Sequence, residues 1–295
     1  MMNEYKGKDV ILMTCSDCNT KCKHCYVCYG GNMTSEQIQR LTEEFLPKYN
    51  TSINGTEVII HPEFFSFFKK IGQTRIMTNG LEIIRNPEVL SKLKESGIEI
   101  ISISYHIGIH DNISAVNKSH ILKVIEVAKK YGMKVRLMVT VNKYNYKNVK
   151  GICEQARILG VDSIRFTNYL KCGNAENLPD DYLSDDQIVE FLQLIEEARS
   201  IYPKDVLEIK RCGTFGSGYG KVRSNFYCPA GNDLIAITPD MNVYPCNFLS
   251  KPCFEIGMVK DGKIYIAKTI NNCGDKCIAR EIYNYNVPVE DYFHE

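Results

Sequence analysis

Three cysteines near the amino terminus have a spacing that suits an iron–sulfur cluster. Cys18, Cys22 and Cys25 follow one another as C-x3-C-x2-C within eight residues. Three thiolates can bind three corners of a [4Fe–4S] cube, and a closed cluster needs a fourth ligand. A metal site that lacks one protein ligand keeps a position open for a substrate or cofactor. The segment is therefore expected to bind a cluster with one open iron.

The spacing, with the ring residue His24 before the third cysteine, resembles the signature of the radical S-adenosylmethionine (radical SAM) superfamily. The resemblance implies that the amino and carboxyl groups of SAM chelate the open iron and that His24 lies near the adenine. It also implies that an electron from the cluster splits SAM into methionine and a 5′-deoxyadenosyl radical. Because Cys15 and Cys28 lie close by, a zinc knuckle or a disulfide knot is the alternative.

The same resemblance implies a set of residues that contact SAM. Asn54-Gly55-Thr56-Glu57 stands where the family often has Gly-Gly-Glu, with threonine in place of the middle glycine. A carboxylate suits the SAM ammonium group. Ser102 and Ser104 alternate with isoleucines, so both serines face one side of a strand. The expected SAM contacts are His24, Gly55, Thr56, Glu57, Asn79, Ser102, Ser104 and Arg136.

Two arginines, Arg136 and Arg165, interrupt otherwise apolar strands. An unpaired arginine is rare in a barrel interior. We therefore expect each to have an anionic partner, either a carboxylate of SAM or substrate or a structural acid.

A second group of cysteines lies near the carboxyl terminus. Its arrangement, with the stretch Pro239-Asp240-Met241-Asn242-Val243-Tyr244-Pro245-Cys246, resembles the auxiliary-cluster extensions of radical SAM enzymes called SPASM and, in the shorter form, twitch. The region has five cysteines, fewer than a full SPASM domain, so one auxiliary [4Fe–4S] cluster is expected. Its predicted ligands are Cys228, Cys246, Cys273 and Cys277, with Cys253 in reserve. The alternative is a zinc ribbon.

One further cysteine, Cys212, lies in the glycine-rich stretch Arg211-Cys212-Gly213-Thr214-Phe215-Gly216. Its thiol is a candidate hydrogen-atom donor to a substrate radical, as some radical SAM epimerases require. The alternative is a small buried thiol without a chemical role.

Alternating strands and helices are predicted to position these residues. Strands are expected at residues 10–13, 57–60, 75–78, 98–104, 134–141 and 161–169, and helices at 34–46, from 62, 86–94, 119–130, 148–159 and 184–201. Thr34 with Gln37, and Ser184 with Gln187, are predicted capping boxes. Six parallel strand–helix units predict an α/β fold, a partial (β/α)6 barrel, with chemistry at the carboxyl ends of the strands.

The remainder of the chain predicts a small cysteine-rich domain that contains a β-hairpin at residues 235–244. The predicted domains are a radical SAM core at 1–204 and an auxiliary-cluster domain of the twitch or SPASM type at 205–295.

Composition excludes several classes of partner. The net charge is +1 over 295 residues, so the protein has no strong positive electrostatic field to attract nucleic acid or a membrane surface. A signal peptide and an 18-residue apolar run are both absent. Thirteen cysteines then point to metal sites in a reducing cytoplasm.

The expected activity is hydrogen-atom abstraction from a ribosomal peptide, leading to epimerisation, a crosslink or oxidation, with a flavodoxin- or ferredoxin-type reductant. The cluster motif begins at residue 18, which argues against a peptide-binding extension and weakens a leader-dependent enzyme. The alternatives are a dehydrogenase or epimerase of a sugar or alcohol, and a non-catalytic iron–sulfur or zinc module for electron transfer.

Overall fold

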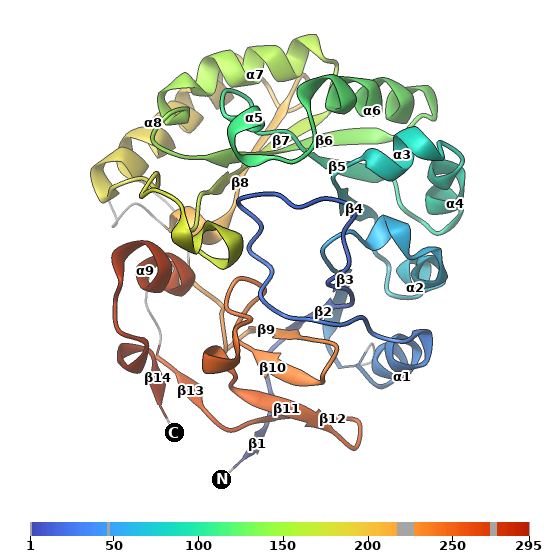
Figure 1. Cartoon of the computed structure of the whole chain (residues 1–295), viewed down its shortest axis with the longest axis vertical. Helices are drawn as coiled ribbons and strands as arrows, with labels where there is room; N and C mark the ends of the chain where they lie inside the picture. Colours follow the sequence, from blue (N-terminus) through green and yellow to red (C-terminus); the bar gives the residue numbers. More distant parts are fainter. Residues whose placement is uncertain (1, 46–47, 217–226, 272–275, 295) are drawn as a thin grey trace.

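The computed structural model describes residues 2–45, 48–216, 227–271 and 276–294. Its parallel strands curve into an arc, with helices along the outer side (Figure 1). β2 (Asp9–Met13) pairs with β3 (Asn50–Asn54). A five-stranded parallel sheet follows in chain order: β4 (Arg75–Thr78), β5 (Ile100–Ser104), β6 (Lys134–Val141), β7 (Ser163–Asn168) and β8 (Glu208–Arg211). The predicted α/β fold is confirmed.

Six of the eight α-helices that the structure describes before the carboxyl-terminal hairpin lie close to the predicted boundaries, whereas the short helices α3 and α5 were not predicted. The eight are α1 (Ser35–Phe45), α2 (Phe65–Lys70), α3 (Leu81–Arg85), α4 (Val89–Glu95), α5 (His110–Ile113), α6 (Lys118–Lys130), α7 (Val149–Ile158) and α8 (Asp185–Ile201). Both capping boxes form, because Thr34 and Gln37 exchange hydrogen bonds before α1 and Ser184 and Gln187 do so before α8. α6 buries one apolar stripe, Ile121, Val124, Ile125 and Ala128, against the sheet. None of the described helices is long and apolar enough to span a bilayer.

The predicted second strand at 57–60 is wrong. The strand that pairs with β2 lies earlier, at Asn50–Asn54, and Val58–Ile60 forms one 3₁₀ turn. Thr51 and Ile53 are buried in alternation along the strand, whereas Val58 and Ile59 are buried without a strand partner. The apolar run at 58–60 therefore reflects burial in the core, and the period of two in a mostly polar segment marks the strand.

The carboxyl-terminal hairpin is confirmed and joins the first barrel strand. β9 (Leu234–Ile237) and β10 (Asn242–Tyr244) pair antiparallel, and β9 runs parallel to β2. β11 (Gly257–Lys260), β12 (Lys263–Ile266) and β1 (Asn3–Glu4) extend this sheet, while β13 (Thr269–Ile270) pairs with β14 (Phe293–His294). The division into domains at residues 204 and 205 stays a prediction.

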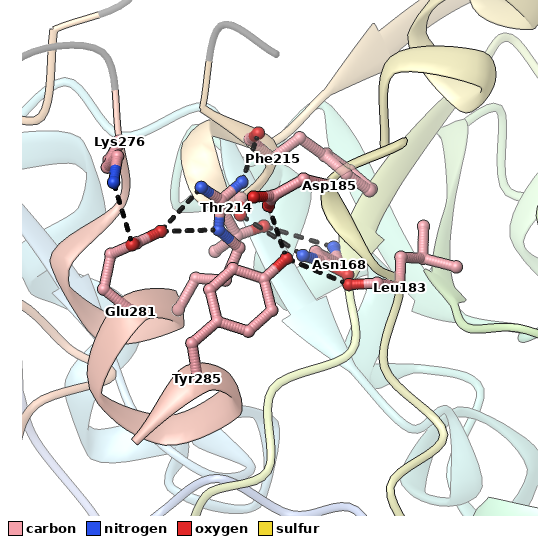
Figure 2. Close-up of polar contacts among 9 residues, drawn as sticks. Asn168, Leu183, Asp185, Thr214, Phe215, Lys276, Glu281 and Tyr285 are labelled. Atoms are coloured by element: carbon pink, nitrogen blue, oxygen red, sulfur yellow. Dashed lines mark hydrogen bonds and ion pairs between the residues drawn. The ribbon is translucent and has the colours of Figure 1, made fainter. Parts of the chain in front are cut away.

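The last helix, α9 (Ile278–Tyr285), is tied to the barrel by polar contacts (Figure 2). Arg280 is fully buried, pairs with Glu281 at 2.7 Å and donates a hydrogen bond to the Phe215 carbonyl at 2.8 Å. The Tyr285 hydroxyl donates to the Leu183 carbonyl at 3.1 Å and contacts the Asp185 carboxylate at 2.8 Å. α9 is thereby held against the segment after β8 and the start of α8.

Candidate active site

A cavity of about 940 Å³ lies within the arc of strands. Each residue predicted for the first cluster or for SAM lines it: Cys18, Cys22, His24, Cys25, Gly55, Thr56, Glu57, Asn79, Ser102, Ser104 and Arg136. Cys212 lines it too. Segments far apart in the sequence thus converge on one space.

Two of the three amino-terminal thiols have N–H donors close to their sulfurs. The Ala115 N–H donates to Cys22 Sγ at 3.3 Å, and Asn79 Nδ2 donates to Cys18 Sγ at 3.6 Å. Burial raises the pKa of Cys25, and the thiols of Cys18 and Cys22 raise it further, which shows that the three groups are close enough to interact. N–H donors at sulfur suit a thiolate-bound cluster.

The donor set therefore fits a cluster held by three protein ligands. Among the residues that the structure describes, no three His, Cys, Asp or Glu side chains are already gathered closely enough to hold one metal ion. Binding would draw the cysteine side chains together.

Residues that the sequence did not indicate hold this loop in place. The Asn174 N–H and side chain donate to the carbonyls of Cys25 at 2.9 Å and Cys22 at 3.0 Å. Gly173 has a φ of +60°, and a Cβ there would lie 2.3 Å from the Cys25 carbonyl oxygen. Only glycine allows that approach. No local motif around Gly173 could have revealed it.

Glu57 connects the turn that begins at Gly55 to the cysteine loop through Asn79. Its buried carboxylate accepts hydrogen bonds from the Thr78 hydroxyl at 2.5 Å and from the Asn79 N–H at 2.7 Å. Asn79 in turn donates to the Asn19 side chain at 2.7 Å. Burial raises the pKa of Glu57 to about 7.

Gly55 and Thr56, which precede this glutamate, are both engaged by Cys15. A Cβ on Gly55 would lie 2.5 Å from Cys15 Sγ, and the Thr56 hydroxyl donates to the Cys15 carbonyl at 3.2 Å. Cys15 therefore packs beneath this turn, which explains a cysteine that the cluster motif does not need.

Three histidines lie beside the loop, of which the sequence indicated only His24. The His24 and His106 rings meet edge to face at 4.5 Å, and His106 stacks on His110 at 5.6 Å. His106 Nδ1 accepts the Thr140 N–H at 3.0 Å, and His106 Nε2 is buried without a partner among the described residues. The position of His106, two residues after Ser104 at the end of β5, was the available signal.

The carboxyl-terminal cysteines form a separate environment that does not line the cavity. Cys228, Cys246 and Cys277 are 6% to 8% exposed, whereas Cys253 is exposed. Burial raises the pKa of Cys246 to about 12, and a hydrogen bond with Cys228, together with burial, raises the pKa of Cys277. The fourth predicted ligand, Cys273, lies outside the described residues.

Comparisons with known proteins identify the fold. No protein-family model matches the chain, and no curated protein matches it. The Streptococcus suis protein SuiB bound to its precursor peptide SuiA is similar, with a TM-score of 0.69 and 13% identity, over 97% of this chain and 67% of that one. SuiB bound to S-adenosylmethionine has a TM-score of 0.67 and 14% identity, over 94% of this chain and 65% of that one. The protein anSMEcpe with bound AdoMet and a Cp18Cys peptide has a TM-score of 0.63 and 18% identity, over 86% of this chain and 78% of that one.

These similarities show that the chain shares the fold of SuiB and anSMEcpe. The chain spans 60% to 67% of the length of the SuiB chains.

Proposed function

We propose that this protein is a radical SAM enzyme that abstracts a hydrogen atom from a peptide. The observation that carries the proposal is the convergence of Cys18, Cys22 and Cys25 with Glu57, Asn79 and the strand-end serines on one cavity. When bound, a [4Fe–4S] cluster supplies the electron for reductive cleavage of SAM. The protein's part is to hold the reactants in place and keep water away.

The site residues divide by position. Cys18, Cys22 and Cys25 would hold the cluster, with the Ala115 N–H and Asn79 Nδ2 donating to its sulfurs. Glu57 has free lone pairs beyond its two hydrogen bonds and can accept the SAM ammonium group. Gly55, Thr56, Ser102 and Ser104, with the ring of His24, would complete the SAM contacts.

A peptide substrate is supported by the similar structures, two of which were solved with peptides bound. Epimerisation, crosslinking or oxidation are the candidate outcomes, and Cys212 is the candidate hydrogen-atom donor because its thiol faces the cavity. A sugar or alcohol substrate is the second candidate.

An auxiliary cluster is proposed at Cys228, Cys246, Cys273 and Cys277, with Cys253 in reserve. Burial of three of these thiols away from the cavity supports a closed site. The proposal also includes a flavodoxin- or ferredoxin-type reductant, which would supply electrons to the cluster. It places the protein in a reducing cytoplasm, where exposed thiols are not oxidised.

The test is anaerobic reconstitution of the full chain, followed by addition of SAM and dithionite. We expect about eight irons per chain, from two cubes, and formation of 5′-deoxyadenosine. The C18A/C22A/C25A variant should form none, and C28A, which removes a neighbouring thiol outside the motif, should match the wild type. Iron without SAM cleavage would favour an electron-transfer module instead, and zinc would favour a non-catalytic metal-binding module.

The substrate class needs a separate measurement. A synthetic peptide encoded by a short reading frame beside the gene would be incubated with the reconstituted enzyme in D2O. Deuterium at one α-carbon would establish epimerisation, and a mass loss of about two hydrogens would indicate a crosslink or oxidation. Lack of any change in the peptide would favour the small-molecule alternative.

A further inference from the structure

Three arginines line the base of the barrel lumen, which is the end of the cavity near the amino ends of the strands. Alternate residues of a strand face the same side, and on β6 the residues lining the cavity are Arg136, Met138 and Thr140. On β7 they are Arg165 and Thr167. β4 contributes Arg75 at its first position. On each of these three strands, the first residue to line the cavity is an arginine.

The register of the sheet brings the three guanidinium groups to one region. Arg136 pairs with Ser163 across β6 and β7, and Arg165 lies two residues further along β7, or about 7 Å. Burial lowers the pKa of Arg136, and the charges of Arg75 and Arg165 lower it further. Burial and Arg165 likewise lower the pKa of Arg75. Arg136 therefore experiences the charges of both Arg75 and Arg165, and Arg75 experiences that of Arg165.

Carboxylates do not balance these charges. The carboxylate nearest Arg136 belongs to Glu208, 3.8 Å away, and Glu208 is already paired with Lys210 at 2.8 Å. The Arg136 Nε donates to Ser163 Oγ at 3.1 Å. In the described part of the chain, the side chains of Arg75 and Arg165 have no hydrogen-bond or ion-pair partner.

The two other acids of the lumen form no ion pair with these arginines in the described part of the chain. The two carboxylates that line the cavity are Asp9 and Glu57. Asp9 accepts a hydrogen bond from the Asn50 side chain at 3.1 Å, and Glu57 holds Thr78 and Asn79 at the other end of the strands. The base of the lumen thus has a surplus of positive charge, in which Arg136 is 97% buried, Arg165 is partly buried and Arg75 is exposed at the rim. Burying like charges without an anion is unfavourable.

We propose that Arg75, Arg136 and Arg165 form a binding site for a phosphate group at the base of the lumen, separate from the SAM site. The cysteine loop follows the carboxyl end of β2, whereas Arg136 is only the third residue of β6, about 17 Å before that strand ends. Guanidinium forks match the oxygens of phosphate. A doubly charged phosphate also neutralises more of the surplus than one carboxylate can. Arg136 is thereby assigned to this anion rather than to SAM.

The test is binding of inorganic phosphate to the reconstituted full chain, measured by isothermal titration calorimetry at constant ionic strength. R75Q and R165Q target the two arginines whose side chains have no partner in the described part of the chain, because loss of the buried Arg136 would also remove its hydrogen bond to Ser163. R85Q is the matched control, since Arg85 lies exposed on α3, outside the cavity. We expect saturable binding at one site, weakened about tenfold or more by each lumen variant and unchanged in R85Q.

Two further arms define the ligand. Saturating SAM should leave phosphate affinity unchanged, and competition between them would overturn the assignment to a separate site. Tighter binding of glycerol 3-phosphate than of phosphate would identify a phosphate ester as the ligand, and equal or weaker binding would identify the free anion. Non-saturable binding, or equal affinity in the wild type, R75Q and R165Q, would overturn the proposal.

Discussion

The two cysteine regions of this molecule differ in exposure and in what surrounds the sulfurs. Cys18, Cys22 and Cys25 are partly exposed and face the central cavity, and N–H groups donate to two of the sulfurs. Cys228, Cys246 and Cys277 are buried outside that cavity, and Cys277 directly precedes α9, which is anchored to the barrel. Under the proposed function, the first region would exchange a ligand at an open iron, and the second would hold a closed cluster.

The largest expected effect, on substrate turnover, comes from removing thiols of the buried cysteine region while keeping those of the exposed region. In C228A/C246A, we expect about half of the iron to be lost, with 5′-deoxyadenosine formation retained and substrate turnover reduced by at least 100-fold. Iron analysis and product assays measure the three quantities. C253A is the control, because Cys253 is exposed, and it should keep its iron and turnover. Full turnover by C228A/C246A with the first cluster intact would contradict the distinction.

The anchoring of α9 gives the next largest effect, on stability. R280M leaves the buried Glu281 carboxylate without its nearest cation, and Lys276 at 3.4 Å is only a partial substitute (Figure 2). We expect the free energy of unfolding in urea to fall by about 3 kcal/mol. The double variant R280M/E281L should recover much of that loss, because both charges of the buried pair are then removed together. A loss that is equal in both variants would show that the charge pair is not the cause.

The pH dependence of stability tests the environment of Glu57, which lies beside the amino-terminal cysteine region. Its pKa in the folded protein is about 7, above the ordinary value of 4.5, so the folded state binds the proton more tightly than the unfolded state. This group's contribution to stability is therefore present below pH 4.5 and is lost as pH rises to about 7, on the order of 3 kcal/mol.

The measurement is urea unfolding of the wild type, E57Q and E95Q at several values between pH 5 and pH 8. The stability of the wild type relative to E57Q should decline across this range. E95Q, which removes an exposed carboxylate of α4, should follow the wild type throughout. A constant difference between the wild type and E57Q would mean that Glu57 keeps an ordinary pKa.

The sequence predicted those parts of the fold and site that depend on local patterns. The C-x3-C-x2-C spacing, the capping boxes and the alternation of Ser102 and Ser104 with isoleucines depend on near neighbours in the chain. Both capping boxes form, and the cysteines and serines line one cavity. β3 was misplaced because burial gave Val58 and Ile59 the appearance of a strand. Gly173 and Ala115 contact the cysteine loop only through tertiary structure, so no local pattern could indicate them.

The smallest effect expected is in the turn that precedes Cys246. Met241 has a φ of 66°, a left-handed conformation that costs a side chain about 1 kcal/mol, yet it is not glycine. Met241 is half-buried, so its packing offsets part of the gain, and M241G should raise the free energy of unfolding by about 0.5 kcal/mol. D261G is the comparison, because Asp261 has a φ of 49° in the next hairpin and aspartate tolerates that conformation better. A larger gain in D261G than in M241G would show that packing of Met241, rather than its backbone strain, decides the stability of this turn.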